Sequence, residues 1–497
     1  MTAPLLLAAA LLLAAGPLPA AAAASGTDRA ALMRTVERLA APEFQGRLAG
    51  SPGYLAAARE MAERFRAAGL IPGGTGDAGP QRYFQDLTVE YAAIDECRLA
   101  LVGADGAARE LAHGPDFTCR GFTGSGRLTA PVAFVGYGLS KPKAGYDDYA
   151  GVDARGKVAL AFKEPPPFTA DSAGWGEAPL PRPKGLTAAA HGAVALLLVS
   201  RPNQEHPQKP IASTLEGDGR QDEGFPRLQV DVPVAAAMLR AAGLDLVQLA
   251  NAIDSTRAPR SRELPVQARV GVTAHYRAQQ PAVNVVAILE GSDPELRDEY
   301  VVLGAHLDHV GAQGDSLYFP GANDNASGAA AVLGIAEAFA GGGARPRRSL
   351  IFGLWAAEES GLLGAKRFVS APPVPRERIV AYLNFDCVGR GDSIQVGGGK
   401  SYPALWRTAR ELDAAGSRLL VEATWGGGGA DAAPFEAAGI PNLYFASRPS
   451  YAHLHLASDT PATLNPALLE AIARLGHGVA RRLADGAAPA AAPAGAR

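Results

Sequence analysis

Apolar residues near the start of the chain recur at steps of three and four positions, the period of a helix with one buried face. Within residues 27–69 this pattern occurs twice, through Leu32, Val36 and Leu39 and then through Tyr54, Met61 and Phe65. Gly69 follows the second stretch, and glycine is the residue that most often ends a helix. The pattern therefore predicts two amphipathic helices before residue 70.

A different pattern covers residues 119–277, where short apolar runs such as 132–135 and 157–162 are separated by Gly, Pro and Asp. Runs of this length bounded by turn residues indicate strands. Residues 193–200 are a further buried strand candidate, and residues 233–242 a short helix. This stretch predicts a small β-rich module.

From residue 281 onward, apolar strand candidates alternate with helical segments. The strands are predicted at 283–289, 300–305, 349–355, 379–385 and 442–445, and the helices at 326–339, 362–369, 402–414 and 466–481. Such alternation is typical of an α/β fold in which helices cover both faces of a sheet. We therefore expect a mixed, largely parallel central sheet sandwiched by helices, with the β-rich module inserted before it.

The first 24 residues have the features of an export signal. An unbroken apolar run at 5–15 is too short to span a bilayer, and Ala22-Ala23-Ala24 matches a cleavage site before Ser25. Because Lys and Arg are missing before the run, an uncleaved anchor is the alternative. The expectation is an exported protein, periplasmic or secreted, with no stable membrane anchor after cleavage.

Composition narrows the function classes. The chain has 497 residues, which favours two domains, and 47% hydrophobic with 20% charged residues is ordinary for a globular protein. A net charge of −3 without a basic stripe gives no reason to expect nucleic acid as a partner. Residues 486–497 are rich in Ala, Pro and Gly, which predicts a disordered tail.

Three cysteines leave two possibilities open. Cys97 and Cys119 can pair in an oxidising compartment, or both can remain buried thiols. Cys387 is single in either case. The chain has no Cys-x-x-Cys, so a sulfur-ligated metal site has no support.

Two histidines and an aspartate directly follow the strand predicted at 300–305, as His306-Leu307-Asp308-His309. Alternate residues of a strand share a face, so His306 and Asp308 are expected to point the same way. A carboxylate beside a metal-binding imidazole can fix its tautomer. The motif on its own is only weak evidence for a metal.

Acidic residues stand at the ends of other predicted elements. Asp324 precedes an Ala-rich helix and is either a helix cap or, among small neighbours, a carboxylate that bridges two cations. Glu358 and Glu359 follow the strand at 349–355, where α/β sheets place ligand sites. Adjacent side chains diverge, so one can bind metal while the other faces substrate. A solvated acidic turn is the alternative.

Two more such positions complete the pattern. Asp386 ends the strand predicted at 379–385, and His455 lies in a second histidine pair with His453. Imidazole and carboxylate ligands without thiolate suit zinc, and also cobalt or manganese.

The order of the motifs HLDHVG, GANDNASG, AAEESGLLGAKRF, NFDCVG and HLASDT resembles the di-zinc exopeptidase superfamily of bacterial leucine-type aminopeptidases and glutamate carboxypeptidases. This resemblance extends from about residue 284 to 484. The stretch with FVGYG and YDDY resembles a protease-associated domain. The implied layout is a peptidase domain at 25–118 and 278–485, interrupted by a protease-associated insert at 119–277.

The resemblance implies a site with two zinc ions (Co²⁺ or Mn²⁺ being possible substitutes). In that site His306 and Asp386 are ligands of one zinc, Glu359 and His455 are ligands of the other, and Asp324 bridges both.

It also implies that Glu358 is the general base and Asp308 the partner that orients His306. Two positions depart from the usual pattern. Leu454 stands where many relatives have Tyr before the last histidine, and Asp431 lies between two alanines where many have Ser-Asp-His.

The implied activity is removal of residues from peptides with a free N-terminus. A carboxypeptidase or dipeptidase on the same scaffold is the second hypothesis, and it needs a cationic clamp for which Arg390 and Lys400 are the nearest candidates. A non-catalytic, receptor-like binding module is the third. The oligomeric state and the preferred N-terminal residue stay open.

Overall fold

The computed structural model describes residues 27–486 apart from 104, 170–173, 215, 218 and 316. The predicted export signal at 1–24 and nearly all of the predicted tail lie outside the described residues. Within the described part of the chain, no helix is both long and apolar enough to cross a membrane.

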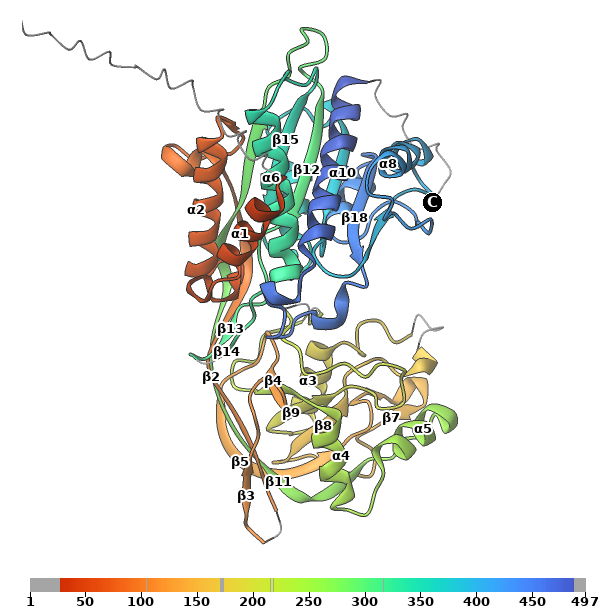
Figure 1. Ribbon diagram of the computed structural model, residues 1–497. Helices are drawn as coiled ribbons and strands as arrows, with labels where there is room; N and C mark the ends of the chain where they lie inside the picture. The colour runs from red at the N-terminus through yellow and green to blue at the C-terminus, as the bar shows by residue number, and fades with distance from the viewer. Residues whose placement is uncertain are drawn as a thin grey trace, which may run out of the picture.

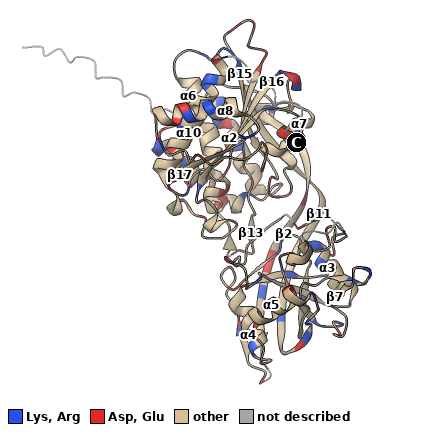
Figure 2. Cartoon of the chain, turned by 90° about the vertical axis from the view of Figure 1, so that its right-hand side faces the viewer, with Lys and Arg blue, Asp and Glu red and all other residues tan. Residues whose placement is uncertain are grey.

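The chain forms two lobes, one above the other in Figure 1, and each has its own hydrophobic core. The main lobe takes its core from residues 32–89 and 282–484. The inserted lobe takes its core from residues 94–272. In Figure 2, basic and acidic residues are intermingled along both lobes, in keeping with the small net charge of −3.

The main lobe is built on a mixed sheet whose central strands are parallel. The strand order is β17 (Ser393–Gly397), β18 (Asn442–Arg448), β16 (Ile379–Phe385), β12 (Tyr300–His306), β15 (Ser349–Trp355) and β11 (Arg262–Leu289). The four strands from β18 to β15 are parallel to one another, and β17 and β11 pair antiparallel on the two sides. The predicted largely parallel sheet is confirmed.

Helices cover both faces of this sheet because side chains alternate along each buried strand. On β12, Val301 and Leu303 belong to one core and Val302 to another. The first core is covered by α1 (Arg29–Leu39), α2 (Pro52–Ala67), α6 (Ser327–Gly341), α8 (Pro403–Ala415) and α10 (Pro466–Asp485). The opposite face carries α7 (Leu363–Ser370) and α9 (Ala432–Ala437).

The inserted lobe is also a parallel sheet with helices. Its strands run in the order β5 (Gly126–Phe134), β8 (Val158–Phe162), β9 (Ala195–Val199), β10 (Arg227–Val230) and β4 (Phe117–Cys119), of which β4 is antiparallel. Three helices accompany them, α3 (Pro181–Ala190), α4 (Val232–Arg240) and α5 (Leu246–Thr256). The strand predicted at 193–200 and the helix predicted at 233–242 are confirmed.

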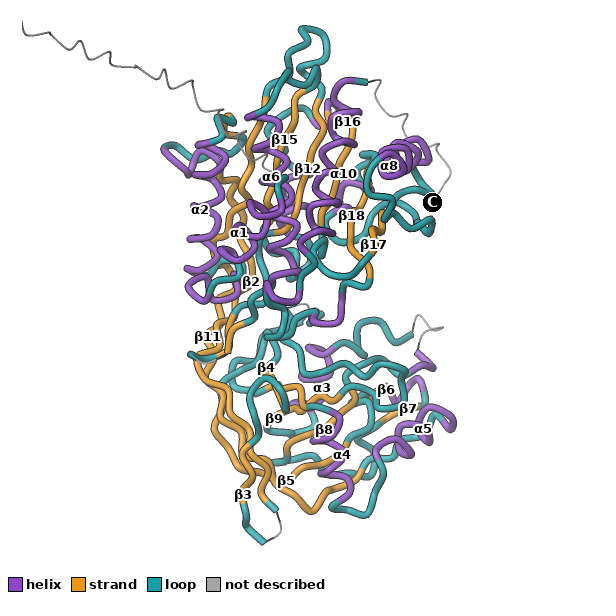
Figure 3. Tube along the Cα trace, viewed as in Figure 1, coloured by secondary structure: helices purple, strands orange, loops and turns teal. Residues whose placement is uncertain are grey.

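Two long antiparallel strands, β2 (Phe84–Val102) and β11, run from one lobe into the other, as Figure 3 shows. The inserted core begins at Ile94, before the boundary predicted at 118/119, and β11 continues through the boundary predicted at 277/278. The Gln280-Pro281 step interrupts the apolar pattern, but the ladder absorbs it as a register shift between Arg277 and Gln280.

Short strands and a disulfide complete the two lobes. These strands are β1 (Ile71–Pro72), β3 (Ala108–Glu110), β13 (Ala312–Gln313) and β14 (Leu317–Tyr318), together with the separate pair β6 (Ser140–Lys141) and β7 (Tyr146–Asp147). Cys97 on β2 forms a disulfide with Cys119 on β4, and Cys387 is a buried free thiol. Of the two expectations for Cys97 and Cys119, pairing is the one that the structure has.

A buried arginine joins the N-terminal segment to two loops of the main lobe. Arg47 ends a 3-10 helix (Pro42–Arg47) and is fully buried. Its guanidinium donates hydrogen bonds to the carbonyl oxygens of Leu307 at 2.9 Å, Leu39 at 2.6 Å, Pro320 at 2.8 Å and Gly321 at 2.9 Å. Burial lowers the pKa of Arg47 to about 10, so it remains charged at neutral pH.

We expect Arg47→Lys to destabilise the main lobe by about 2–4 kcal/mol, because a lysine cannot reach all four carbonyls and each buried unsatisfied group costs about 1–3 kcal/mol. The measurement is the melting temperature by calorimetry, which should fall by roughly 5–15 °C. Arg38→Lys, at a half-exposed ion pair with Glu60, is the control and should change little. Equal melting temperatures for both variants would contradict the role assigned to Arg47.

Candidate metal centre

The carboxyl ends of the parallel strands converge on one cluster of buried imidazoles and carboxylates. His306 ends β12, Asp386 directly follows β16, and Glu359 follows β15. His455 follows β18, and Asp324 lies in the turn that leads into α6. Open α/β sheets bind ligands at this edge. The tertiary structure brings together all five residues that the sequence analysis singled out as ligands.

Three of these residues form a first group. The Nε2 atom of His306 lies 3.3 Å from Oδ1 of Asp324 and 3.3 Å from Oδ1 of Asp386. All three side chains are buried. Their donor atoms are close enough to one another to contact a single cation.

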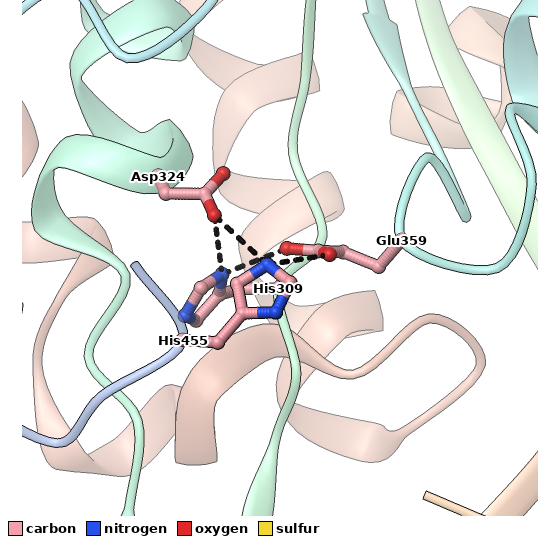
Figure 4. Close-up of side chains that lie close together, drawn as sticks. All are labelled: His309, Asp324, Glu359 and His455. Atoms are coloured by element: carbon pink, nitrogen blue, oxygen red, sulfur yellow. Dashed lines mark hydrogen bonds and ion pairs between the residues drawn. The ribbon is translucent and has the colours of Figure 1, made fainter. Parts of the chain in front are cut away.

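A second group forms on the other side of Asp324, as Figure 4 shows. Nε2 of His455 lies 2.9 Å from Oε2 of Glu359 and 3.2 Å from Oδ2 of Asp324. Asp324 therefore presents one oxygen to each group. This is the geometry that a carboxylate bridging two cations requires.

His309 also belongs to the second group, although the sequence analysis assigned it no role. Its Nδ1 lies 3.0 Å from Oε1 of Glu359 and 3.6 Å from Oδ2 of Asp324. Strand alternation drew attention to positions 306 and 308, but β12 ends at His306 and the chain then turns. The available signal was the second histidine, three residues after the first.

Asp308 lies beside the site but mainly contacts backbone. Its carboxylate accepts hydrogen bonds from the backbone N–H of Glu358 at 3.2 Å and of Glu359 at 3.4 Å. Nδ1 of His306 is 3.2 Å from the carbonyl oxygen of Asp308 and 3.8 Å from its carboxylate. Because the strand ends at His306, alternation does not apply at Asp308. Its carboxylate instead positions the turn that carries the two glutamates.

The cluster concentrates negative charge where little water reaches it. Burial, together with Glu359 and Asp431 nearby, raises the pKa of Glu358 well above its ordinary value. Burial alone would lower the pKa of His306, but the carboxylates around it, Glu358 first, raise that pKa well above its usual range. Buried carboxylates require positive charge nearby. Protonated histidines or a bound cation can supply it.

The donor chemistry fits zinc. The possible ligand groups offer imidazole nitrogens and carboxylate oxygens and contain no cysteine. Zinc binds such N/O sets, and cobalt and manganese accept them as well. In the described part of the chain, no Lys or Arg side chain forms an ion pair with Asp308, Asp324, Glu359 or Asp386.

Side chains outside the two groups hold the ligands in place. The Tyr444 hydroxyl donates to Oδ2 of Asp386 at 2.8 Å. The Asp459 carboxylate accepts the backbone N–H of Asn323 at 3.0 Å and of Asp324 at 3.0 Å. Neither residue stands out in the sequence. Tyr444 reaches Asp386 only through the pairing of β18 with β16, and Asp459 is far along the chain from Asn323 and Asp324.

The inserted lobe contributes a strap, residues 211–214, that reaches the ligand loops. The Thr214 hydroxyl donates a hydrogen bond to the carbonyl oxygen of Glu359 at 2.6 Å. The backbone N–H of Ala212 donates to the carbonyl oxygen of His455 at 3.3 Å. Glu216, next to the strap, forms a buried ion pair with Arg120 at 2.5 Å. The two lobes therefore meet at the candidate site.

Asp431 and the segment before Leu454 differ in their exposure to solvent. Asp431 is buried, and neither of its carboxylate oxygens has a hydrogen-bond partner among the described residues. Burial raises the pKa of Asp431 well above its ordinary value. Tyr451, three residues before Leu454, is exposed on the 3-10 helix Tyr451–His453.

Comparison with known proteins finds a family whose model matches the part of the chain that carries this site. Residues 284–480 match the family model described as peptidase family M28. Leupeptin-inactivating enzyme 1 of Streptomyces exfoliatus is 38% identical over 163 residues, which are 32% of this chain and 34% of that protein. An aminopeptidase of Pseudomonas aeruginosa is 38% identical over 130 residues, 25% of this chain and 22% of that protein. The matched part of the chain thus spans about a third or less of the length of these relatives.

A solved structure, the aminopeptidase from Aneurinibacillus sp. strain AM-1, resembles the whole described fold. It superimposes with a TM-score of 0.62 at 21% identity and covers 94% of this chain and 96% of its own. At 21% identity, this structural likeness shows a shared fold alone. Because almost the full length of both chains is covered, the likeness includes the inserted lobe.

Tyr444→Phe is expected to lower the affinity for one metal ion by roughly 10–100-fold, because partners of this kind orient ligating carboxylates. Zinc binding is measured by competition with a chromophoric chelator. Tyr83→Phe removes another buried tyrosine hydroxyl, one that donates to the carbonyl of Leu70, and should leave the affinity unchanged. Equal affinities in the two variants would show that Asp386 does not need Tyr444.

Proposed function

Residues 284–480 match the model of peptidase family M28, and from this premise we propose that the chain belongs to this family and is a zinc-dependent aminopeptidase with two metal ions. The observation that carries the proposal is the pair of ligand groups that share Asp324, with Glu358 beside them. The substrates are peptides with a free N-terminus.

The first group of His306, Asp324 and Asp386 would hold one zinc ion, and Asp324, Glu359 and His455 the other. Bound there, two zinc ions would supply Lewis acidity that polarises the scissile carbonyl and makes a water molecule more acidic. The residues of this chain have to orient the peptide, hold the ligands rigidly and move the proton.

Glu358 is the proposed general base. A carboxylate oxygen of Glu358 lies within 4.8 Å of a ring nitrogen of His306 and of a carboxylate oxygen of Glu359. Among the described residues, no hydrogen bond or ion pair occupies the Glu358 carboxylate. Burial raises its pKa well above the ordinary value, which suits a group that takes a proton from water and passes it to the leaving amine. Asp308 holds the backbone of the turn, so Glu358 and its neighbour diverge.

The acidic surroundings favour an aminopeptidase over a carboxypeptidase. A free α-amine is a cation, and the carboxylates Glu358, Asp386 and Asp431 lie near the two groups. A substrate carboxylate would need a positively charged partner, since an unpaired charge in a closed site is costly. Arg390 and Lys400, the candidates for such a clamp, form no ion pair with the cluster among the described residues.

We also propose that the protein acts after export and that its inserted lobe is a protease-associated domain. The Cys97–Cys119 disulfide supports an oxidising compartment. The strap at 211–214 supports a role of the inserted lobe in bordering the substrate cleft, because Thr214 and Ala212 contact the backbones of Glu359 and His455.

Glu358→Gln should lower kcat by roughly 10²–10⁴-fold, the usual loss when a general base is removed, while both zinc ions stay bound. Glu359→Gln should instead lose one zinc ion, because that carboxylate contacts His309 and His455. Turnover and metal content are measured on the same preparations. The reverse pattern would exchange the roles of the two glutamates.

A panel of substrates tests the reaction class. Leu- or Ala-nitroanilide should be hydrolysed, and acetylation of the α-amine should abolish most of the rate, because the acidic site then has no cation to bind. Peptide trimming is followed by mass spectrometry as an independent readout. Loss of residues from the C-terminus, or equal rates on free and acetylated substrates, would favour the carboxypeptidase hypothesis instead.

A further inference from the structure

We propose that His309 is a sixth metal ligand, which gives the second metal ion four protein donors while the first has three. The inference rests on the proposed two-metal function and adds a residue to which the motif resemblance assigns no role. It also predicts that the two ions differ in affinity and in accessibility.

The first argument is the convergence of four side chains. The donor atoms of His309, Asp324, Glu359 and His455 all lie within 4.8 Å of one another. Two imidazoles and two carboxylates come from four separate segments, and Figure 4 shows their nitrogens and oxygens turned toward a common centre. A tetrahedral set of two nitrogens and two oxygens is a regular zinc environment.

The second argument concerns which contacts a hydrogen bond can explain. Nδ1 of His309 lies 3.0 Å from Glu359 and 3.6 Å from Asp324, and one N–H can serve only the nearer oxygen well. A second imidazole, His455, faces the same two carboxylates. A shared cation accounts for all four contacts together.

The third argument is that the backbone fixes the ring in this position. His309 is fully buried, and its backbone N–H donates a hydrogen bond to the carbonyl oxygen of Arg47 at 3.1 Å. Its ring lies against Gly321, where an added Cβ would come within 2.6 Å of the ring atoms. The Nε2 atom has no partner among the described residues, so Nδ1 is the nitrogen that the protein directs into the cluster.

The consequence is an asymmetric pair of metal sites. Structural zinc sites are closed by four protein ligands, whereas catalytic sites keep an open position. With His309 included, the group around Glu359 is closed and should bind zinc more tightly. The group of His306, Asp324 and Asp386 has three donors and keeps room for water or a substrate group.

Metal binding tests this without any assay of turnover. The apo protein is titrated with zinc, and zinc-edge X-ray absorption on the fully loaded wild type counts the imidazoles. We expect three imidazoles for two zinc ions. Replacing His309 by Ala should leave two imidazoles and weaken one binding step by at least about 100-fold, beyond the 10–100-fold typical of residues that only orient a ligand.

His309→Gln separates a ligand from a positioning residue. A glutamine amide can still donate a hydrogen bond to Glu359, so it should preserve tight binding only if orientation is the role of His309. His477→Ala is the control, because His477 is a half-buried histidine of α10 that packs on Phe339. Melting temperatures confirm that each variant is folded.

The outcomes are distinct. Two imidazoles in the wild type with two bound ions, or unchanged affinities in His309→Gln, would overturn the role of His309 and leave the proposed function intact. The wild-type spectrum decides even if a variant fails to fold. A wild-type protein that binds no zinc would overturn the proposed function as well.

Discussion

The candidate site depends on one buried guanidinium. Arg47 donates hydrogen bonds to carbonyl oxygens of Leu307, which lies between His306 and His309, and of Pro320 and Gly321, which precede Asp324. These loops follow different strands, β12 and β14. A planar group with five donors can tie such loops together at fixed geometry, which lysine cannot do. The N-terminal helices are therefore part of the machinery of the site.

The second constraint is electrostatic. Several carboxylates lie within the same buried region, and the pKa of Glu359 is lowered to about 2 because histidines outweigh the effect of its burial. In contrast, burial raises the pKa of Asp308 to about 7. Glu359 contacts two imidazoles at 3.0 Å or less, whereas the imidazole beside Asp308 lies 3.8 Å away, and the pKa values of these neighbouring acids differ accordingly. This difference suits a site in which some carboxylates are ligands and others accept backbone N–H groups or handle protons.

The third constraint is the connection between the lobes. β2 and β11 are continuous through both, the Cys97–Cys119 disulfide joins β2 to the inserted sheet, and the strap at 211–214 returns to the backbones of Glu359 and His455. The inserted lobe is thus attached at its base and at the site. Any movement of the strap would shift the backbones of the two loops that carry Glu359 and His455. This arrangement couples the geometry of the candidate metal centre to a lobe that supplies none of the five candidate ligands.

The sequence by itself determined the class of fold and five candidate ligands. Alternation of strands and helices is a local feature, and so are the polar residues that follow strands or precede a helix, namely His306, Asp324, Glu359, Asp386 and His455; parallel strands bring such ends to one edge of a sheet. The sequence could not show that β12 stops at His306, so it did not show that the Asp308 carboxylate accepts the backbone N–H groups of Glu358 and Glu359, and it assigned His309 no role. It could not find Arg47, Tyr444 or Thr214 as supports, because each acts on residues far away along the chain. Those contacts exist only once the strands pair and the inserted lobe folds back, and they were decided by the tertiary structure.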